Sequence, residues 1–173
     1  MKRDIEIYVS EQEIKNRVQQ LGEQISKDYG DQEVTIIAVL TGSFIFCADL
    51  LRHLTCPVKI EFIMASSRSG LRSTGTVDVK LDLKRDITDH HVILIEDVVD
   101  TGLTVTHLLD MVKKKNPKSL KLCAFLYKPA QMKHKVDVDY LGFEVEDKFL
   151  VGYGLDYNGL YRELPYIGVY DEK

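Results

Sequence analysis

The amino-acid sequence predicts an α/β fold with a mainly parallel central sheet, and three observations support this prediction. Short apolar runs typical of buried strands recur along the chain. Segments with the apolar spacing of amphipathic helices separate these runs, and this alternation favours parallel pairing with helices flanking the sheet. The length of 173 residues suits a single domain over residues 1–173, because no linker, internal repeat or low-complexity tract divides it.

The first half of the chain is predicted to begin with a helix. Ser10 and Glu13 form a capping box at its start, and apolar residues follow at steps of three and four. Val34–Leu40 has the composition of a buried strand, and the break after it predicts a second helix over Ser43–Leu54. Alternating residues in Val58–Met64 predict the next strand, with one face better buried than the other.

A polar stretch, Ser66–Gly75, is predicted to be a mobile loop, because it holds two glycines and almost nothing to pack. Val77–Leu83 alternates apolar and polar residues and predicts an exposed strand that returns from this loop. Loop and strand together resemble a flap. After the apolar run that begins at Val92, the remaining predicted elements are one helix and three strands: Val105–Val112, Leu120–Leu126, Tyr140–Val145 and Tyr166–Tyr170.

The composition excludes some classes of protein. The formal charge of −4 provides no global field that attracts nucleic acid or an acidic membrane, so any phosphate must be bound locally. Cys47, Cys56 and Cys123 are odd in number and set among apolar residues, which predicts reduced core thiols. The N-terminus lacks a signal-peptide pattern, and no run approaches the roughly 18 apolar residues of a membrane span. We therefore expect a cytoplasmic protein without nucleic-acid or membrane partners.

The most informative segment is Val92–Thr104, an apolar run that ends in three carboxylates. Glu96 and Asp97 stand at the end of the predicted strand, and Asp100 follows three positions later. A buried charge without a partner costs several kcal/mol, so this pattern predicts an active site rather than a structural strand end. In α/β sheets, ligands bind beyond the carboxyl ends of the strands. Two carboxylates there can bind a vicinal diol or a hard cation such as Mg²⁺.

The residues after this strand predict a phosphate site. Asp100–Thr104 leads into a helix, whose first N–H groups have no internal acceptors and carry the positive end of the dipole. Gly102 lets the backbone come close to an anion, and the hydroxyls of Thr101 and Thr104 add donors. A ribose between the acidic pair and this anion site makes the predicted substrate nucleotide-like, with Asp100 as a general base or a stabiliser of developing positive charge.

Two other interpretations of this segment explain less. In the first, Asp100 and Thr101 only cap the following helix. This interpretation does not explain the two carboxylates of Glu96 and Asp97 at the end of the strand. In the second, Asp100–Gly102 is the Asp-Thr-Gly signature of an aspartic protease. Those enzymes need paired copies in an all-β fold, whereas this chain has one copy that runs into an amphipathic helix.

Val92–Thr104 resembles the phosphoribosyl-diphosphate signature of type I phosphoribosyltransferases. Three further segments resemble the hypoxanthine-guanine phosphoribosyltransferases, so that the match covers nearly the whole chain. They are the pyrophosphate loop at Leu40–Phe44, the flexible catalytic loop at Ser66–Gly75, and the purine-binding segment at Asp147–Tyr153 with Leu155–Asn158. The resemblance implies the type I fold, with a small purine-binding hood formed by the terminal segments and a flexible β-flap.

The resemblance also implies a reaction in purine salvage. A 6-oxopurine, hypoxanthine or guanine, would react with 5-phosphoribosyl 1-diphosphate and Mg²⁺ to give IMP or GMP and diphosphate. The partners would be these small molecules and further copies of the chain, as a homodimer or homotetramer. Nothing in the sequence ranks hypoxanthine, guanine and xanthine, because all three carry the 6-oxo group.

Roles on the sugar side follow from the matching positions. Glu96 and Asp97 would hold the ribose hydroxyls and their magnesium ion, and Asp100 would handle the proton at purine N7. The residues implied to bind the 5′-phosphate are Asp100, Thr101, Gly102, Leu103 and Thr104.

On the base side, the resemblance implies that Lys128 donates to the exocyclic O6. An ammonium group has donors and no acceptor, so it favours a 6-oxo group over the 6-amino group of adenine. Phe149 would stack on the purine, and its neighbours Lys148 and Leu150 complete the implied purine-binding set.

On the diphosphate side, Asp156 matches the ligand of a second magnesium ion, and Arg162 matches an arginine whose planar fork pairs with phosphate oxygens. Thr41 and Gly42 of the pyrophosphate loop also belong to the implied diphosphate site. Thr41 departs from the family, which often has a lysine there, so backbone N–H groups must serve instead. A strained peptide is usual in the family at the position of Leu40–Thr41, and the sequence alone does not test it.

The flexible loop carries a second departure. The family commonly has Ser-Tyr where this chain has Ser67-Arg68, and Arg68 is suited to bind diphosphate directly. Two competing functions are disfavoured. A nucleotide-sensing regulatory protein of this fold that binds nucleic acid would be expected to carry a basic face or an appended DNA-binding segment. Lys128 and the Phe149 segment disfavour an adenine or pyrimidine transferase.

Overall fold

The computed structural model describes residues 5–67, 77–81, 83 and 85–171. The central sheet is formed by β2 (Val34–Leu40), β3 (Val58–Ser67), β4 (Val77–Leu81), β5 (His91–Val99), β6 (Ser119–Tyr127) and β7 (Tyr140–Glu144). The helices are α1 (Glu11–Tyr29), α2 (Phe44–Leu51), α3 (Leu103–Lys113) and the short 3₁₀ helix η1 (Pro129–Gln131). A smaller sheet is formed by β1 (Glu6–Val9), β8 (Leu150–Val151) and β9 (Ile167–Val169).

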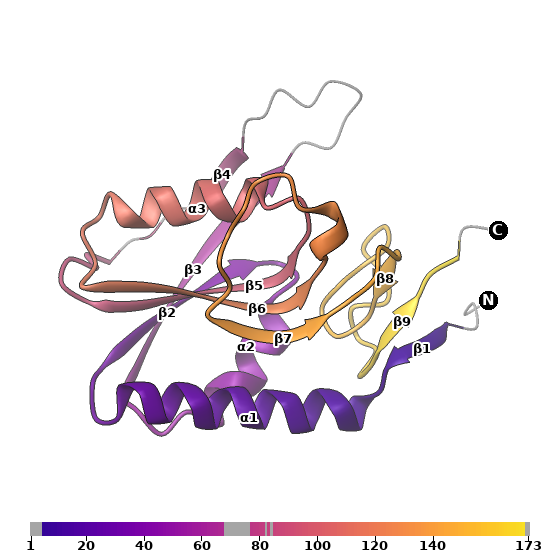
Figure 1. Ribbon diagram of the computed structural model, residues 1–173, viewed down its shortest axis with the longest axis horizontal. Coiled ribbons are helices and arrows are strands. Elements are labelled where there is room, and N and C mark those ends of the chain that lie inside the picture. The colour runs from indigo at the N-terminus through magenta and orange to yellow at the C-terminus, as the bar shows by residue number, and fades with distance from the viewer. Residues whose placement is uncertain (1–4, 68–76, 82, 84, 172–173) are drawn as a thin grey trace.

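The elements are arranged in layers, with α3 on one face of the central sheet and α1 and α2 on the other (Figure 1). The strand order is β4-β3-β2-β5-β6-β7, and every neighbouring pair is parallel except β3 and β4. The predicted α/β fold with a mainly parallel sheet is therefore confirmed. Because β2, β5 and β6 are parallel neighbours, their carboxyl ends meet at one edge, and the loops after them lie together.

A small sheet of order β1-β9-β8 lies at the end of the molecule toward which β6 and β7 run (Figure 1). β1 pairs with β9 in antiparallel fashion, so this sheet joins the two ends of the described chain. We call residues 5–9 and 145–171 the hood. The sequence did not predict β1 or β8, and β8 has only two residues, too few to show an alternating pattern.

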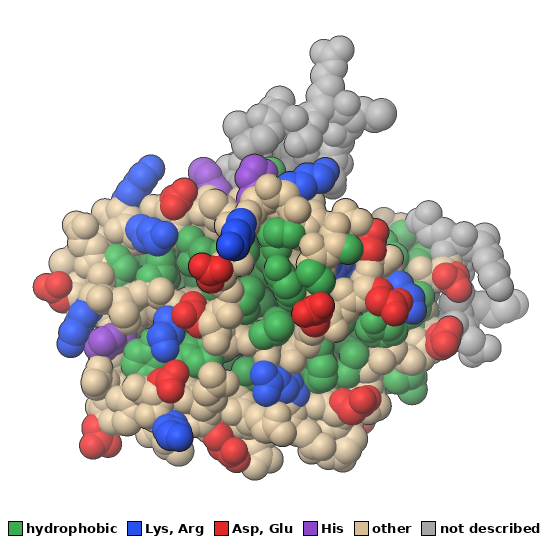
Figure 2. All heavy atoms as spheres, viewed as in Figure 1, with side chains coloured by type: hydrophobic (Ala, Val, Ile, Leu, Met, Phe, Trp, Pro, Cys, Tyr) green, Lys and Arg blue, Asp and Glu red, His purple; other side chains and the backbone are tan. Residues whose placement is uncertain are grey.

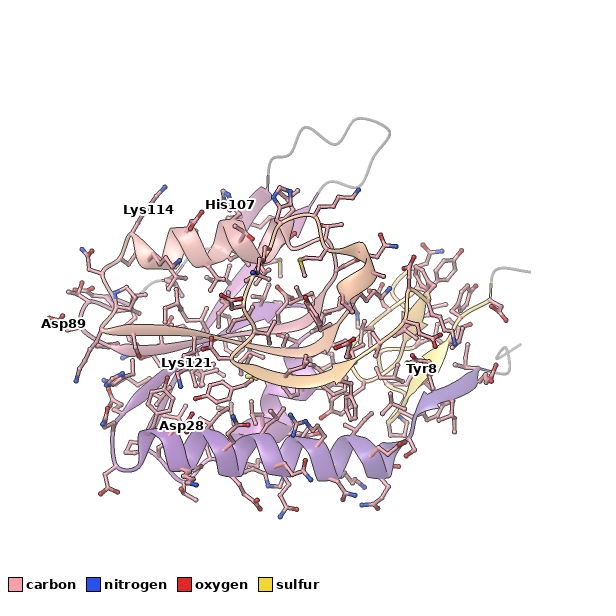
Figure 3. All side chains as sticks on the ribbon, viewed as in Figure 1. Tyr8, Asp28, Asp89, His107, Lys114 and Lys121 are labelled. Carbon is pink, nitrogen blue, oxygen red and sulfur yellow. The ribbon has the colours of Figure 1, made fainter. Side chains whose placement is uncertain are left out.

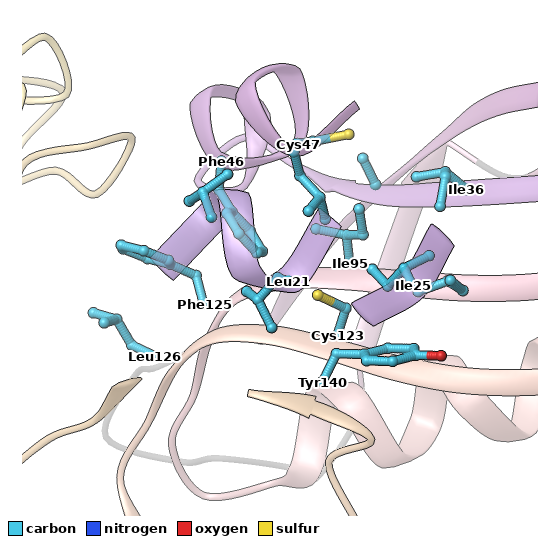
Figure 4. Packing of buried hydrophobic residues seen from close by; sticks show 14 of the residues in the cluster. Leu21, Ile25, Ile36, Phe46, Cys47, Ile95, Cys123, Phe125, Leu126 and Tyr140 are labelled. Atoms are coloured by element: carbon cyan, nitrogen blue, oxygen red, sulfur yellow. The ribbon is translucent and has the colours of Figure 1, made fainter. Parts of the chain in front are cut away.

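Parallel strands that are covered on both faces send alternate side chains into two cores, and β2 shows this pattern. Ile36 and Ala38 pack on the side of α1 and α2, whereas Ile37 and Val39 pack on the side of α3. Figure 4 shows the first core, in which side chains from α1, α2 and the strands interlock, among them Leu21, Ile25, Phe46, Ile95 and Phe125. The three cysteines are free and buried, as predicted.

The predicted capping box is present, since the Ser10 hydroxyl accepts from the Glu13 N–H and the Glu13 carboxylate accepts from the Ser10 N–H. The helix predicted over 43–54 is shorter and ends at Leu51, because the chain turns there and packs His53 against Gly22 of α1.

No helix in the described part of the chain is long and apolar enough to cross a membrane. Acidic and basic side chains are interspersed on the face that Figure 2 shows.

The flap prediction is wrong at its first two residues. Ser66 and Ser67 belong to β3, where their backbones pair with Asp78 and Val77 of β4. Strand pairing uses backbone groups, so these polar residues extend a strand that their side chains do not predict. The rest of the predicted loop, residues 68–75, lies outside the described residues.

The edge of the sheet opposite the carboxyl ends holds a polar cluster between α1 and the strands. The buried ring of Tyr140 carries a hydroxyl that donates to Asp28 Oδ2 at 2.7 Å and accepts from Lys121 Nζ at 2.9 Å. Lys121 also pairs with Asp28 at 3.3 Å, and Figure 3 shows these two side chains close together below the sheet. The cluster fixes the end of α1 to the start of β7.

We expect the substitution Tyr140→Phe to lower the free energy of unfolding by about 1–2 kcal/mol, because it removes two hydrogen bonds to charged groups. For a chain of this size the melting temperature should fall by roughly 2–6 °C in a calorimetric scan. The cluster lies at the opposite edge of the sheet from the predicted site, so enzymatic rates should not change. An unchanged melting temperature would show that the hydroxyl contributes nothing to stability.

Candidate active site

Two adjoining cavities lie at the carboxyl edge of the central sheet. The first, of about 530 Å³, is lined by the ends of β2 and β5 and the start of α3. The second, of about 300 Å³, is lined by the ends of β5 and β6 and by the hood. Asp97, Val98 and Asp100 line both cavities, so these residues form the boundary between them.

The register of β5 explains where the carboxylates point. Glu96 lies beside Ala124 of β6 in the middle of the sheet, and its side chain is only 7 % exposed. Asp97 follows it, and its Oδ1 accepts from the Val98 N–H at 2.8 Å. Glu96 lines only the first cavity, whereas Asp97 lines both cavities. Asp100 is exposed and begins the bend that leads to α3.

The pair of carboxylates has the electrostatics of a cation site. Burial and the neighbouring charge of Asp97 raise the pKa of Glu96 well above its ordinary value. Among the ion pairs of the described residues, none joins Glu96 or Asp97 to a lysine or arginine. Two adjacent oxygen ligands without a cationic partner suit a hard divalent cation, and magnesium prefers such ligands.

The loop after β2 forms the opposite wall of the first cavity. The Leu40–Thr41 peptide bond is cis, and Thr41 and Gly42 both line the cavity. A Cβ atom on Gly42 would lie 1.5 Å from Asp97 Oδ2, so the missing side chain leaves the space that this carboxylate occupies. A Cβ atom on Gly154 would lie 2.1 Å from the Gly42 carbonyl oxygen, which shows that the hood packs directly on this loop.

The turn before α3 is held from outside by the segment that follows η1. Gly102 has φ +81°, and a Cβ atom there would lie 2.1 Å from the His134 carbonyl oxygen. The N–H groups of Lys133 and His134 donate to the Thr101 carbonyl oxygen at 3.0 and 2.9 Å. The turn is therefore fixed at the start of α3, where Thr101, Gly102 and Thr104 line the first cavity. A helix N-terminus beside a cavity favours an anion there.

The second cavity brings together a lysine and an exposed aromatic ring. The N–H of Lys128 donates to the Val99 carbonyl oxygen at 2.9 Å, and its Nζ donates to the Lys148 carbonyl oxygen at 2.7 Å. Phe149 is 53 % exposed although it is a large apolar residue, and it lines the cavity with Leu150. Tyr157 meets the Phe149 ring edge-on, with the ring centroids 5.7 Å apart.

The structure joins two predicted residues of the diphosphate site to each other. Arg162 Nη2 pairs with Asp156 Oδ1 at 2.7 Å, and Arg162 Nη1 donates to the Gly154 carbonyl oxygen. Asp156 Oδ2 accepts from the Gly159 N–H at 2.7 Å. Asp156 lines the second cavity, whereas Arg162 holds the loop that carries Asp156.

Among the predicted site residues that the structure describes with side chains, Leu103, Lys148 and Arg162 line neither cavity. The ammonium group of Lys148 pairs with Glu146 at 2.8 Å and lies 4.9 Å from the ring centroid of Tyr8, which Figure 3 places at the hood. Only the carbonyl oxygen of Lys148 faces Lys128. Ser67 is described as backbone at the end of β3, and Arg68 lies outside the described residues.

Comparisons with known proteins show the family of this chain. The model of the phosphoribosyl transferase domain family matches residues 4–158. The chain belongs to this phosphoribosyl transferase family. It is 43 % identical over 171 residues to the hypoxanthine phosphoribosyltransferase of Buchnera aphidicola, with 97 % of each chain covered. It is 38 % identical over 174 residues to the hypoxanthine-guanine-xanthine phosphoribosyltransferase of Tritrichomonas foetus, with 99 % of this chain and 95 % of that protein covered.

The solved structures agree. A crystal structure of a hypoxanthine-guanine phosphoribosyltransferase from Bacillus anthracis, with a HEPES molecule in its active site, superimposes with a TM-score of 0.92 at 40 % identity. The superposition covers 97 % of this chain and 100 % of that chain. The α/β architecture of this phosphoribosyl transferase is therefore that of the type I fold.

Some residues at the site of this phosphoribosyl transferase were predicted only as members of a segment, and Leu126 was not predicted at all. Leu126 and Leu155 line the second cavity, and Tyr157 supports Phe149. Leu126 reads as an ordinary strand residue, so no local signal marks it. Leu155 and Tyr157 flank Asp156 inside a segment that the sequence does single out, and this position is the signal that would have identified them.

The raised pKa of Glu96 predicts that the ionised, buried carboxylate lowers the free energy of unfolding of this phosphoribosyl transferase at neutral pH. In the folded chain Glu96 keeps its proton to a higher pH than in the unfolded chain, where its pKa is near 4.5. Protonated Glu96 therefore favours folding fully below pH 4.5. This contribution is lost as pH rises through the raised pKa. At neutral pH, Glu96→Gln should therefore increase the free energy of unfolding by on the order of 1 kcal/mol, or about 2–4 °C in melting temperature.

The measurement is a series of thermal melts from pH 4 to pH 8, with the exposed Glu144→Gln as the matched control. The gain of Glu96→Gln over the wild type should be largest at pH 8 and should disappear near pH 4. A gain that is the same at every pH would show that ionisation of Glu96 is not its cause.

Proposed function

We propose that this chain transfers the 5-phosphoribosyl group of 5-phosphoribosyl 1-diphosphate to a 6-oxopurine, hypoxanthine or guanine, in purine salvage. The observation that carries the proposal is the pair of cavities that share Asp97, Val98 and Asp100. One cavity has the carboxylates and helix terminus that suit a ribose phosphate, and the other has a lysine and an aromatic ring that suit a purine. The named activities of the relatives support the same reaction.

The chemical step joins the two cavities at their boundary. The bond from ribose C1 to the diphosphate oxygen breaks, its electron pair leaves with the diphosphate, and purine N9 forms the new bond to C1. The proton of the 6-oxopurine at N7 leaves the ring, and the Asp100 carboxylate accepts it. Positive charge develops on the ribose during this step, and the negative charge of Asp100 stabilises it.

Three carboxylates at the cavities are suited to hold magnesium ions. Glu96 and Asp97 would hold one with the ribose hydroxyls, and Asp156 would hold a second ion on the diphosphate side. A magnesium ion held by these carboxylates would supply positive charge that offsets the negative charge of the leaving diphosphate. Arg162 is suited to the same purpose when its pairing with Asp156 is exchanged for phosphate oxygens, and Thr41 and Gly42 offer backbone N–H groups. The N–H and hydroxyl groups of residues 101–104 would bind the 5′-phosphate.

Base selection is assigned to Lys128. Its ammonium group has only donors, and a 6-oxo group accepts where the 6-amino group of adenine would present further donors. A site built to hydrogen-bond a carbonyl oxygen rejects an analogue without it, because buried donors are then left unpaired. Phe149 would stack on the purine face, which all purines present, so it contributes affinity rather than selection.

The experiment is an incubation of the protein with 5-phosphoribosyl 1-diphosphate, Mg²⁺ and, separately, hypoxanthine, guanine, xanthine and adenine, with chromatographic detection of nucleotides. We expect IMP or GMP, and little or no AMP. Omission of Mg²⁺ or its removal with a chelator should abolish the reaction. No product from either hypoxanthine or guanine would refute the proposed function.

The proposal extends to assembly and compartment. Family resemblance supports a homodimer or homotetramer, and light scattering coupled to gel filtration tests it, since a monomeric mass would contradict it. The cytoplasm suits the three cysteines, which are free and buried. Burial raises the pKa of Cys47 to about 12, so this thiol is protonated and unreactive at neutral pH.

A further inference from the structure

A closed set of contacts surrounds Lys128 in the second cavity. Its Nζ donates to the Lys148 carbonyl oxygen at 2.7 Å and lies 3.8 Å from Asp147 Oδ1. Asp147 Oδ2 in turn accepts from the side-chain amide of Gln131. Gln131 stands at the end of η1, which begins directly after Lys128, and its N–H donates to the Lys128 carbonyl oxygen at 3.2 Å. The contacts therefore form a closed ring that begins and ends at Lys128.

The burial of the two charged groups differs. The side chain of Lys128 is 13 % exposed, whereas that of Asp147 is 55 % exposed. At 3.8 Å the carboxylate attracts the ammonium without receiving a hydrogen bond from it. One ammonium proton is used by Lys148, and the others remain for a ligand in the cavity. The carboxylate thus supplies charge and direction without competing for the protons that a purine oxygen would accept.

Gln131 fixes Asp147 because η1 is short and stiff. Pro129 at the start of η1 locks its φ angle, and η1 places Gln131 three positions after Lys128. The amide of Gln131 bridges from η1 to the loop that carries Asp147, Lys148 and Phe149. The lysine and the stacking ring are therefore held in one frame, although they come from distant parts of the chain.

We propose that Asp147, anchored by Gln131, is a positioning residue that aims the Lys128 ammonium at the purine and so sets the preference for 6-oxopurines. The inference rests on the proposed function, because it concerns how the same cavity reads its base. Asp147 acts through Lys128 and the Lys148 carbonyl group rather than by touching the purine.

Three variants separate charge from anchoring. Asp147→Asn removes the negative charge, yet its amide oxygen can still accept from Gln131. Gln131→Ala keeps the charge and removes the anchor. Glu146→Gln is the matched control, because Glu146 precedes Asp147 in the same loop but pairs with the Lys148 ammonium rather than with Lys128.

In steady-state assays, we expect Asp147→Asn to raise the KM for hypoxanthine roughly three- to tenfold, the range for a partly exposed ion pair that aims a hydrogen bond. The KM for 5-phosphoribosyl 1-diphosphate should stay within about twofold, and the ratio of hypoxanthine to adenine turnover should fall. Gln131→Ala should show the same pattern with a smaller rise, about two- to fivefold. Glu146→Gln should behave as the wild type. Equal changes in both KM values, or a Glu146→Gln variant that matches Asp147→Asn, would overturn the proposal.

A second measurement does not depend on turnover. The Kd of IMP is measured by calorimetry for the wild type, Asp147→Asn, Lys128→Met and the double variant, which gives a double-mutant cycle. If Asp147 acts through the ammonium, Asp147→Asn weakens IMP binding in the wild type and has no further effect beside Lys128→Met. Additive effects would overturn the proposal.

The two measurements distinguish the possible failures. A wild type that binds IMP but forms no nucleotide from hypoxanthine or guanine contradicts the proposed function, while the cycle still decides whether Asp147 acts through Lys128. A wild type that forms IMP while the cycle is additive contradicts the positioning role alone. A wild type that neither binds IMP nor forms it contradicts both.

Discussion

Asp100→Asn is expected to lower the turnover number by about 100-fold or more, the contribution typical of a positioned general base. Asparagine has nearly the same shape as aspartate, so the exposed turn between β5 and α3 should keep its conformation. Its amide cannot accept the proton that leaves purine N7, and it carries no charge to stabilise the ribose as the diphosphate departs. The loss should therefore fall on the chemical step.

The measurement is a single-turnover experiment with enzyme in excess, together with the Kd of IMP by calorimetry. IMP binding should change by less than about threefold, because the phosphate and base contacts remain. Asp110→Asn is the control, since Asp110 is an exposed aspartate of α3 outside both cavities. Equal losses in turnover and in IMP binding would instead assign a structural role to Asp100.

Gly42→Ala is expected to damage the site more than the fold. The new Cβ would lie 1.5 Å from Asp97 Oδ2 and 2.5 Å from its Cγ, so the carboxylate must move. It is the end of a side chain rather than backbone, and it can rotate at modest cost in stability. The rotation takes a predicted magnesium and ribose ligand out of position. We expect kcat/KM for 5-phosphoribosyl 1-diphosphate to fall about 100-fold, the scale on which a misplaced catalytic geometry acts.

Thermal melts and a Mg²⁺ titration of the rate test this prediction. The melting temperature of Gly42→Ala should fall by only a few degrees, and half-maximal rate should need a higher Mg²⁺ concentration. Gly30→Ala is the opposite control, because Gly30 ends α1 at φ +56° with no atom within 4 Å of a Cβ. It should lower stability through backbone strain without changing catalysis. Normal Mg²⁺ dependence in Gly42→Ala would contradict the displacement of Asp97.

Much of the fold can be predicted from the sequence because β2 and most of β5 are buried on both faces. Runs such as Val34–Leu40 show their burial in composition alone, and the capping box at Ser10 marks a helix start through local hydrogen bonds. The short strand Leu150–Val151 could not be predicted, because its pairing partner lies on β9 and a two-residue strand has no period. Its position follows from tertiary contacts of the hood.

The candidate site, like the fold, could be predicted from the sequence only in part. Glu96, Asp97 and Asp100 stand close together in sequence, so their meeting at one strand end could be predicted. The contact between Gly42 and Gly154 joins loops 112 positions apart, and only the folded chain shows it. Family resemblance placed Lys148 in the purine site as a residue, but its side chain turns to Glu146 and only its carbonyl oxygen faces Lys128. A residue-level match does not distinguish backbone from side chain.

The shared boundary of the two cavities has a consequence for how such proteins diverge. Asp97, Val98 and Asp100 line both cavities, so under the proposed function a substitution there should alter the bond-forming step for every base. The remaining walls of the second cavity come from the end of β6, from Lys128 and from the hood, and these residues do not line the first cavity. Under the proposed function, base preference can therefore change through substitutions at Lys128 or in the hood while the residues that line the first cavity stay the same. Under the proposed function, the residues for the reaction and most residues that select the base thus lie in different parts of the fold and can change independently.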